Sequence, residues 1–516
     1  MKKNILPIFI LCFIQSAIGQ APEDILRYSY FPVTGSARSM AIGGAMGALG
    51  GDINALYVNP AGLGLYKTRE IVITPGFNLN NNNFNYRGTG NETNRSAFNL
   101  GTSGFVTGYN TRGSKWTSQA FSVGINQMAN FNNQYTYKGT NDFSSMSELF
   151  AKQFSSSRQN FNDALNNPQF AFGTAPAIYT YLIDTFRNAN NVLEVKGLPE
   201  FLLKQGIALQ QEKTVKTSGG ITELAVGYAA NMDDKIYIGG SVGIPFVSYE
   251  RNTTYRESDP SGNNNNNFNF FELKDRIKTT GVGVNAKLGI IFKPQEQVRL
   301  GVTVHTPTYY SLSDQQNSSL TTDTEGYNGK ETVESSKFTA NNNAGISDYL
   351  LYSPWKAMVS GSYVFREVND TRKQRAFISA DIEYIGYRNA TFRAPGEEVS
   401  ENERRYYGDL KDVINDYYKG AFNFRLGGEL KFNTIMFRLG GAYYSSPYKQ
   451  KELKSNIIQA TGGLGYRNKG KFIDLSYAHN FLKDVHFPYR LEDKQNTFAT
   501  QRGSRGNVVL TLGFKL

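Results

Sequence analysis

The last segment of the chain alternates regularly between apolar residues and small or polar ones. Neighbouring side chains on a β-strand point to opposite faces, so a period of two residues predicts a strand. The segment 505–516 therefore predicts a strand that ends the chain. One face is apolar and the other is mixed, with Val508, Leu510, Leu512, Phe514 and Leu516 on the first and Val509, Thr511, Gly513 and Lys515 on the second.

The same alternation recurs along the chain and predicts fourteen strands. Each is long enough to cross a membrane as a tilted strand of about 9 to 11 residues, whereas no apolar run approaches the roughly 20 residues of a membrane helix. The predicted strands are 69–79, 97–109, 117–128, 219–231, 235–249, 277–292, 297–309, 352–367, 374–388, 420–432, 435–446, 456–467, 471–482 and 505–516.

The connections between these strands alternate between short and long. The short ones include 231–234, 293–297 and 468–471, and the long ones include 129–218, 251–275, 310–351, 389–419 and 483–504. A transmembrane barrel has short periplasmic turns and longer external loops. The pattern therefore predicts an all-β fold, a 14-stranded antiparallel transmembrane β-barrel over residues 69–516 with both termini at the short-turn end.

The long loops differ in character. The asparagine-rich stretches 78–94 and 261–270 are predicted to be solvated external tips. The insertion at about 129–218 contains three apolar-faced helix candidates and is predicted to be partly helical, because loops of that length usually carry structure or function. Two interpretations stay open: the helices close the barrel mouth, or their apolar faces capture a ligand. The candidate capture residues are Ile178, Tyr181, Phe201 and Leu202.

Residues 1–19 have the form of a secretory signal peptide, with Lys2 and Lys3 before an apolar run and small residues before Gln20. The single cysteine, Cys12, lies inside that run, so the exported chain would have no thiol. Disulfide frameworks and cysteine metal sites are excluded on this basis. The 51 glycines, 32 tyrosines and 35 phenylalanines also suit a large β protein.

Residues 20–68 precede the first predicted strand and are rich in glycine and alanine, which suits close packing inside a barrel as a plug. The motif "GSARSMAIGGAMGALGGDINALYVNPAGLG" at 35–64 strongly resembles the N-terminal hatch of FadL/TodX-type outer-membrane transporters. The segments "RLGGELKFNTIMFRLGGAYYSSPY" and "NVVLTLGFKL" resemble the last barrel strands of that family. The resemblance covers both ends of the chain.

The resemblance implies a fourteen-stranded barrel with an N-terminal hatch in the cell outer membrane. It also implies passive uptake of hydrophobic small molecules such as long-chain fatty acids, through external capture, hatch movement and lateral release into the membrane. We expect a monomer in contact with outer-membrane lipid, with no enzyme activity and no cofactor. The residues expected to pack and gate the hatch are Gly43, Gly44, Gly47, Gly50, Gly51, Asn59, Pro60, Ala61 and Gly62.

The carboxylate of an amphiphilic ligand needs a cation, and alternation places Arg425 and Arg438 on the inward face. These two are candidates for ligand binding, and the alternative interpretation is ordinary lumen polarity. Asp381 and Glu383 lie two residues apart on one strand face and are interpreted as pore lining rather than a catalytic pair.

Other chemistry is poorly supported by the sequence. The glycine-rich stretch lacks the Gly-Lys-Ser/Thr ending of a phosphate-binding loop. Three scattered histidines, His305, His479 and His486, do not predict a metal site, and no basic cluster predicts nucleic-acid binding. Two alternative functions remain: a barrel that docks a protein partner in a secretion machinery, as PorV does, and a haemin receptor.

Overall fold

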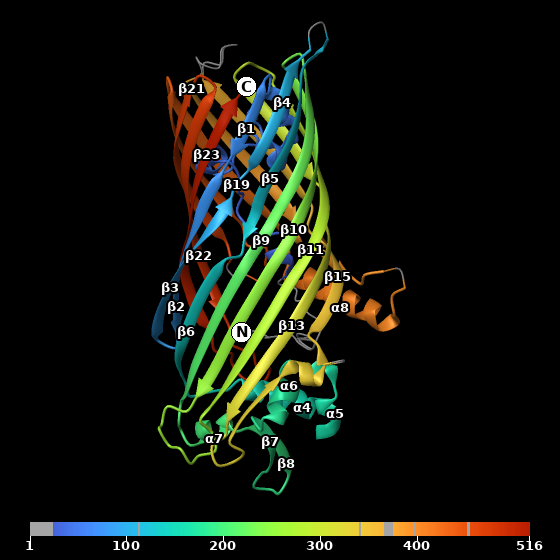
Figure 1. The fold of residues 1–516 in the computed structure, drawn as a ribbon, viewed down its shortest axis with the longest axis vertical. Helices are drawn as coiled ribbons and strands as arrows, with labels where there is room; N and C mark the ends of the chain where they lie inside the picture. The colour runs from blue at the N-terminus through green and yellow to red at the C-terminus, as the bar shows by residue number, and fades with distance from the viewer. Residues whose placement is uncertain (1–23, 112–113, 340–341, 366–374, 397, 451–454) are drawn as a thin grey trace, which may run out of the picture.

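The computed structural model describes residues 24–516 except 112–113, 340–341, 366–374, 397 and 451–454. The predicted signal peptide and Cys12 therefore lie outside the described residues. Antiparallel pairing runs from each strand to the next and closes between β1 (Arg69–Ile73) and β23 (Ala499–Lys515). The prediction of a closed fourteen-stranded antiparallel barrel is confirmed (Figure 1).

Some strands of the barrel run through without a break and others consist of two elements. The unbroken strands are β9 (Leu209–Met232), β10 (Ile236–Ser258), β11 (Phe270–Phe292), β19 (Gly420–Phe432), β20 (Ile435–Tyr444), β21 (Ile457–Asn468), β22 (Lys471–His486) and β23. The broken strands are β1 with β2 (Pro75–Tyr86), β3 (Thr89–Leu100) with β4 (Ser103–Asn110), β5 (Trp116–Asn130) with β6 (Asn133–Asn141), β12 (Val298–His305) with β13 (Tyr309–Asp323), β15 (Gly345–Tyr352) with β16 (Lys356–Phe365), and β17 (Ala376–Gly386) with β18 (Thr391–Arg393). The short β14 (Lys330–Glu334) pairs with the end of β13.

The barrel wall is much taller on one side than on the other. Strands β9 and β10 have 24 and 23 residues, whereas β20 has 10. Figure 1 shows the tall strands running down to the helical end of the molecule, at the bottom of the view, while the C-terminus lies at the opposite, short-turn end. The tall strands extend into regions predicted to be loops, so the insertion between β6 and β9 covers 142–208 rather than 129–218.

The prediction of a solvated loop at 78–94 is wrong. This stretch forms most of β2 and β3, which pair residue by residue up to a tight turn at Arg87 and Gly88. Both turn residues have positive φ, at 49° and 87°, as in the primed turns that suit two-residue hairpins. The asparagines belong to the strands because the side chains at alternate positions point into a polar barrel interior.

The outer face of the barrel carries a continuous apolar belt. Along β19 and β20 the exposed positions alternate with buried ones, as the strand period requires. An outward apolar band is the mark of a barrel that sits in hydrocarbon. Exposed members of the belt include Phe424, Leu426, Leu430, Phe437, Leu439, Ile473, Leu475, Ile238, Ile290 and Val302. Among the described residues, no helix is long and apolar enough to cross a membrane.

The N-terminal segment, residues 24–68, lies inside the barrel (Figure 1). Its short helices are α1 (Asp24–Arg27), α2 (Ala37–Ala41), α3 (Ala55–Val58) and the 3-10 helix η1 (Pro60–Leu65). Helix α2 packs against β20 to β23, while η1 packs against β5 and β9 to β11 on a different part of the wall. The segment therefore spans the lumen.

Helices gather at the long-loop end. The insertion 142–208 forms α4 (Ser147–Ser157), α5 (Phe161–Leu165), η2 (Pro168–Phe170), α6 (Thr174–Tyr179), the hairpin β7 (Ile183–Arg187) with β8 (Leu193–Gly197), and α7 (Pro199–Lys204). We call this group the cap. It shares an apolar core with inward-facing side chains at the long-loop ends of the tall strands, including Tyr255, Phe271 and Leu320. The other described helices are η3 (Ser335–Phe338), η6 (Tyr387–Asn389) and α8 (Glu401–Tyr417).

Candidate functional site

Glycines of the N-terminal segment meet glycines of the barrel wall. A Cβ atom on Gly43 would lie 2.6 Å from the carbonyl oxygen of Gly441, and one on Gly440 would lie 2.3 Å from the carbonyl carbon of Ile42. A Cβ on Gly47 would lie 2.0 Å from Ser360 Oγ. Real Cβ contacts do not come this close, so the segment and the wall touch only because these glycines lack side chains. The glycine-rich composition of this segment is therefore a requirement of packing in the lumen.

Polar contacts fasten the same segment. Asn59 accepts a hydrogen bond from Ala61 N at 3.1 Å and donates to the carbonyl oxygen of Gly47 at 2.6 Å. From the wall, Asp381 accepts from Gly47 N at 3.2 Å and Arg299 donates to Leu49 O at 2.7 Å. The other predicted hatch residues, Gly44, Gly50, Gly51, Pro60, Ala61 and Gly62, lie in this same segment inside the barrel, and all except the half-buried Gly51 are buried. These contacts would have to break for the segment to move.

The substitution Gly440→Val is expected to lower the stability of the barrel by about 1–3 kcal/mol, because overpacking a close contact costs this much. The measurement is the midpoint of denaturant unfolding. The matched control is Gly462→Val, at an outward position where a Cβ meets nothing closer than 3.4 Å. The control should change stability by less than about 0.5 kcal/mol. Equal effects of the two substitutions would contradict the proposed contact.

The two arginines selected from the sequence both lie inside the barrel and both are paired with acids. Arg425 donates to Glu383 at 2.6 Å and lies 4.0 Å from Asp381. Arg438 donates to Glu429 and to Asp474, each at 2.6 Å. Neither guanidinium is free to bind a ligand carboxylate while these pairs are intact. Their positions agree with the alternative interpretation, ordinary lumen polarity, and whether they bind a ligand stays a prediction.

A second group of charges lies inside the barrel nearer the long-loop end. We call it the lumen cluster; its members are Arg95, Lys213, Arg251, Asp275, Asp484 and Arg505. Arg251 pairs with Asp275 at 3.4 Å, and Lys213 donates to the carbonyl oxygen of Pro488 at 2.9 Å. Four cations and two acids give this interior region a positive charge. Such a region favours an anionic or polar group.

Arg505 differs from the other cations of the lumen cluster. It shares the inward face of β23 with the buried Asn507 and Val509, yet its side chain is exposed. Its cross-strand neighbours are the neutral Asn480 and Asn80. Within the described part of the chain its side chain makes no hydrogen bond and no ion pair within 4.0 Å, although Asp484 attracts it. Sequence reasoning missed this residue, although the alternation in 505–516 already placed it inward.

The barrel wall has a seam where β3 faces β6. In the described ranges no backbone ladder joins these two elements: β3 pairs with β2, and β6 pairs with β9. Side chains bridge the gap instead. Arg95 donates to the carbonyl oxygens of Asn133 and Thr217 at 3.1 and 3.3 Å, and Asn130 donates to that of Phe98 at 2.9 Å. Side-chain bonds can open without unzipping a ladder, so the wall can part here more easily than across a complete ladder.

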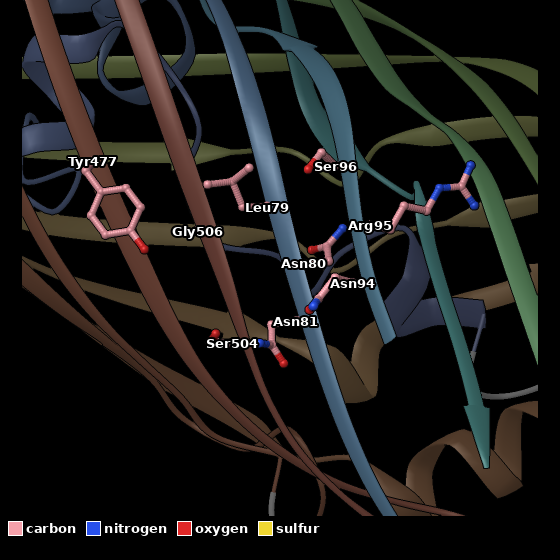
Figure 2. A pocket seen from close by; sticks show the side chains of 9 residues that line it. All are labelled: Leu79, Asn80, Asn81, Asn94, Arg95, Ser96, Tyr477, Ser504 and Gly506. Atoms are coloured by element: carbon pink, nitrogen blue, oxygen red, sulfur yellow. The ribbon is translucent and has the colours of Figure 1, made fainter. Parts of the chain in front are cut away.

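A pocket of about 260 Å³ lies beside the seam (Figure 2). Figure 2 shows Tyr477 on β22, Gly506 on β23 and Leu79 on β2, with Arg95 of β3 extending away from them. The remaining lining residues are polar: Asn80, Asn81, Asn94, Ser96 and Ser504. Leu79 and Tyr477 are exposed on the outer wall, so the pocket opens to the outside of the barrel.

The cap residues predicted to capture a ligand divide into two groups. Ile178 and Leu202 are buried in the core of the cap. Tyr181 is 42% exposed, and its ring lies 6.2 Å from that of Tyr327. Phe201 is half-buried and packs edge-on against Phe186 at 4.7 Å. The cap thus both closes the barrel mouth and presents aromatic surface, and the role of this surface in capture stays a prediction.

A buried carboxylate fastens the cap to the barrel. Glu257, at the end of β10, accepts hydrogen bonds from Ser145 Oγ at 2.5 Å and Met146 N at 2.8 Å at the start of α4. It also accepts from Gln211 of β9 at 2.9 Å. Gln211 Nε2 also donates to the phenol oxygen of Tyr489, in the last loop, at 3.0 Å. Burial raises the pKa of the Tyr489 phenol, so the phenol stays a neutral partner.

The three histidines lie in separate places. The imidazole of His305 contacts the carbonyl oxygen of Val58 at 3.0 Å, His479 lies beside Phe481, and His486 contacts Gln501 at 2.9 Å. Over the residues that the structure describes, no three His, Cys, Asp or Glu side chains group as metal ligands.

These features define a closed transmembrane β-barrel whose lumen holds its own N-terminal segment. A search of solved structures finds a Pseudomonas aeruginosa FadL homologue, with 13% identity, TM-score 0.52, and coverage of 94% of this chain and 98% of that one. It also finds the P. putida toluene transporter TodX, with 12% identity, TM-score 0.51, and coverage of 94% and 99%. The chain therefore has the fold of the FadL and TodX channels. No family model matches the sequence, and no curated protein does.

Proposed function

We propose that this protein is an outer-membrane channel for the passive uptake of hydrophobic small molecules. The observation that carries the proposal is the unpaired Arg505 inside a barrel whose lumen is filled on one side by the N-terminal segment and whose wall is interrupted by a seam. The likeness of the fold to the FadL homologue and to the toluene transporter TodX supports the same class of function.

The proposed ligand is an amphiphile with a carboxylate, such as a long-chain fatty acid. A purely hydrocarbon ligand cannot form a hydrogen bond with a cation in the barrel interior, whereas a carboxylate forms a charge-assisted hydrogen bond with a guanidinium. In this proposal the exposed aromatic surface of the cap, with Tyr181 and Phe201, makes the first contact. Arg505 and Lys213 of the lumen cluster then hold the carboxylate.

Release in this proposal is lateral, because the seam between β3 and β6 lies next to the lumen cluster. Arg95 belongs both to the cluster and to the bonds that close the seam. A ligand carboxylate that draws Arg95 inward would remove two of these bonds. Movement of the N-terminal segment would open space on the short-turn side of the lumen cluster, because that segment fills the lumen there.

Cells that produce this barrel as their only channel for such ligands are expected to take up labelled oleate faster than cells with an empty vector. Heat-modifiable migration of the barrel on a gel serves as the control for correct insertion. An uptake rate equal to that of the vector, with the barrel inserted, would contradict the proposal. A stoichiometric protein partner co-purifying with a ligand-free barrel would favour the docking function instead.

The substitution Arg505→Gln is expected to weaken oleate binding by about tenfold or more. A hydrogen bond to a charged group contributes about 1.5–3 kcal/mol, and 1.4 kcal/mol is a factor of ten. Displacement of a fluorescent fatty acid from the purified barrel measures the dissociation constant. Lys216→Gln is the control, because Lys216 is an exposed cation on the outer face of β9. Equal affinities of wild type and Arg505→Gln would exclude Arg505 as the carboxylate site.

A further inference from the structure

Two cations lie directly opposite each other on the outer wall. Lys483 of β22 pairs in register with Arg502 of β23, and both side chains are exposed. Like charges in directly opposed positions of an antiparallel pair repel and destabilise the pair. The arrangement is therefore unfavourable unless an anion lies between the two cations.

Several other exposed cations of the outer wall have acids opposite or beside them. Lys278 of β11 faces Glu250 of β10, and Arg276 donates to the same Glu250 at 3.0 Å. Lys274 pairs with Glu272 at 3.0 Å. These cations are balanced by acids, whereas the pair on β22 and β23 is not.

The acids nearest in sequence or register do not neutralise the pair. Asp484 follows Lys483 but belongs to the inward face of β22, where it lies near His486. Glu92 of β3 lies two strands away from Arg502 and accepts hydrogen bonds from Asn81 and Asn94. In the described part of the chain, no acid lies within 4.0 Å of Lys483 or Arg502.

The register places this pair at the edge of the apolar belt. Successive outward rows across β22, β23 and β2 contain Tyr477, Val508 and Phe77; then His479, Gly506 and Leu79; then Phe481, Ser504 and Asn81; then Lys483, Arg502 and Asn83. Residues on one face of a strand are about 7 Å apart along it. The two cations therefore lie one row beyond Phe481, where the belt thins to Val485 beside the polar Thr500 and Asn85, at the level of lipid headgroups.

The pocket of Figure 2 lies between the belt and the two cations. Gly506 makes room for it, because a Cβ there would lie 2.9 Å from the Tyr477 oxygen. The side of the pocket formed by Leu79 is apolar, and the side toward the two cations is polar. The Oδ1 atom of Asn81 is buried and has no hydrogen-bond partner among the described residues. A hydroxyl group in the pocket would satisfy this oxygen.

We propose that Lys483 and Arg502 bind the phosphate of an outer-leaflet membrane lipid. The hydroxyl-bearing part of its headgroup occupies the pocket, and its acyl chain follows the belt past Leu79 and Val508. Two adjacent cations match the charge and the several oxygens of a phosphate. The continuity of the pocket with the apolar belt favours a lipid over free phosphate. This site lies outside the lumen and goes beyond the proposed uptake.

The test is lipid binding to the full-length barrel, purified in an uncharged maltoside detergent and titrated with phosphatidylglycerol. Native mass spectrometry counts the bound lipid. Wild type should retain one lipid that the double variant Lys483→Gln, Arg502→Gln binds about tenfold or more weakly. Each cation near an anionic surface contributes about fivefold, so the two together exceed tenfold. The matched control Lys216→Gln, Lys278→Gln removes the same charge elsewhere on the outer wall and should bind like wild type.

Two further arms identify the source of the phosphate. Diacylglycerol with the same acyl chains lacks the phosphate and should bind both forms weakly and equally. Inorganic phosphate at the same concentration should not displace the lipid. Equal binding by wild type and the Lys483 and Arg502 variant would overturn the site, as would an equal loss in the control variant. Displacement by inorganic phosphate would overturn the assignment to a lipid.

Discussion

Deletion of residues 20–60 is expected to convert a closed barrel into one that conducts ions steadily in a planar bilayer. The deletion removes α2 and α3, which fill the lumen between opposite parts of the wall. A barrel of this size lies between small barrels filled by their own side chains and the porins of 16 to 18 strands with an open channel. The lumen wall left behind is lined by charged groups such as Arg425 and Glu383, which tolerate water.

The control for this deletion removes the hairpin 183–197, which lies in the cap outside the barrel wall. That variant should stay closed, because the lumen remains filled. Both variants must keep the heat-modifiable migration of a folded barrel. A folded deletion variant whose conductance stays at the level of wild type would show that the N-terminal segment does not plug the lumen.

The barrel itself was predictable from the sequence because each strand lies between two different environments. Lipid on one side and a polar lumen on the other impose a period of two, as along 420–432 and 505–516. Strand ends were less predictable. Beyond the membrane the tall strands β9 to β11 are polar on the outside as well, so alternation fades while the ladder continues to Ser258.

The asparagine-rich stretch shows why composition misleads inside a barrel. Asn80 and Asn82 point inward and donate to Asn132 O and Asn133 Oδ1 at 2.7 and 2.8 Å. A polar side chain that faces a lumen looks in sequence like one that faces water.

Helix α8 was not predicted, although the sequence contains a signal for its start. Ser400 and Glu403 form a capping box.

The candidate site depended on register, which a single strand does not reveal. Alternation placed Arg425 and Arg505 inside the barrel equally well. The difference between them lies in the neighbouring strands, since Arg425 is opposite Asp381 and Arg505 is opposite Asn480. The seam likewise arises from the missing ladder between β3 and β6. It has no local sequence mark beyond the breaks that divide β3 from β4 and β5 from β6.

Chemical locking of the seam should stop transport. Cysteines introduced by Phe98→Cys and Asn130→Cys face each other across the gap, where Asn130 donates to Phe98 O at 2.9 Å. The only natural cysteine, Cys12, lies in the predicted signal peptide, so the labelling is specific. A bifunctional methanethiosulfonate cross-linker, which forms a reducible disulfide with each cysteine and releases sulfinate, then holds β3 to β5. The control pair Ile238→Cys and Ile290→Cys is directly opposed on the outer face of β10 and β11, where the ladder is complete.

Uptake of labelled oleate by cells with the cross-linked seam tests the central claim most directly. The account predicts that uptake falls to the level of the empty vector, recovers when the cross-linker is cleaved, and is unaffected by cross-linking the control pair. Oleate binding to the locked barrel should persist, because Arg505 is untouched. Undiminished uptake through a fully cross-linked seam would contradict a channel that releases its ligand through this part of the wall.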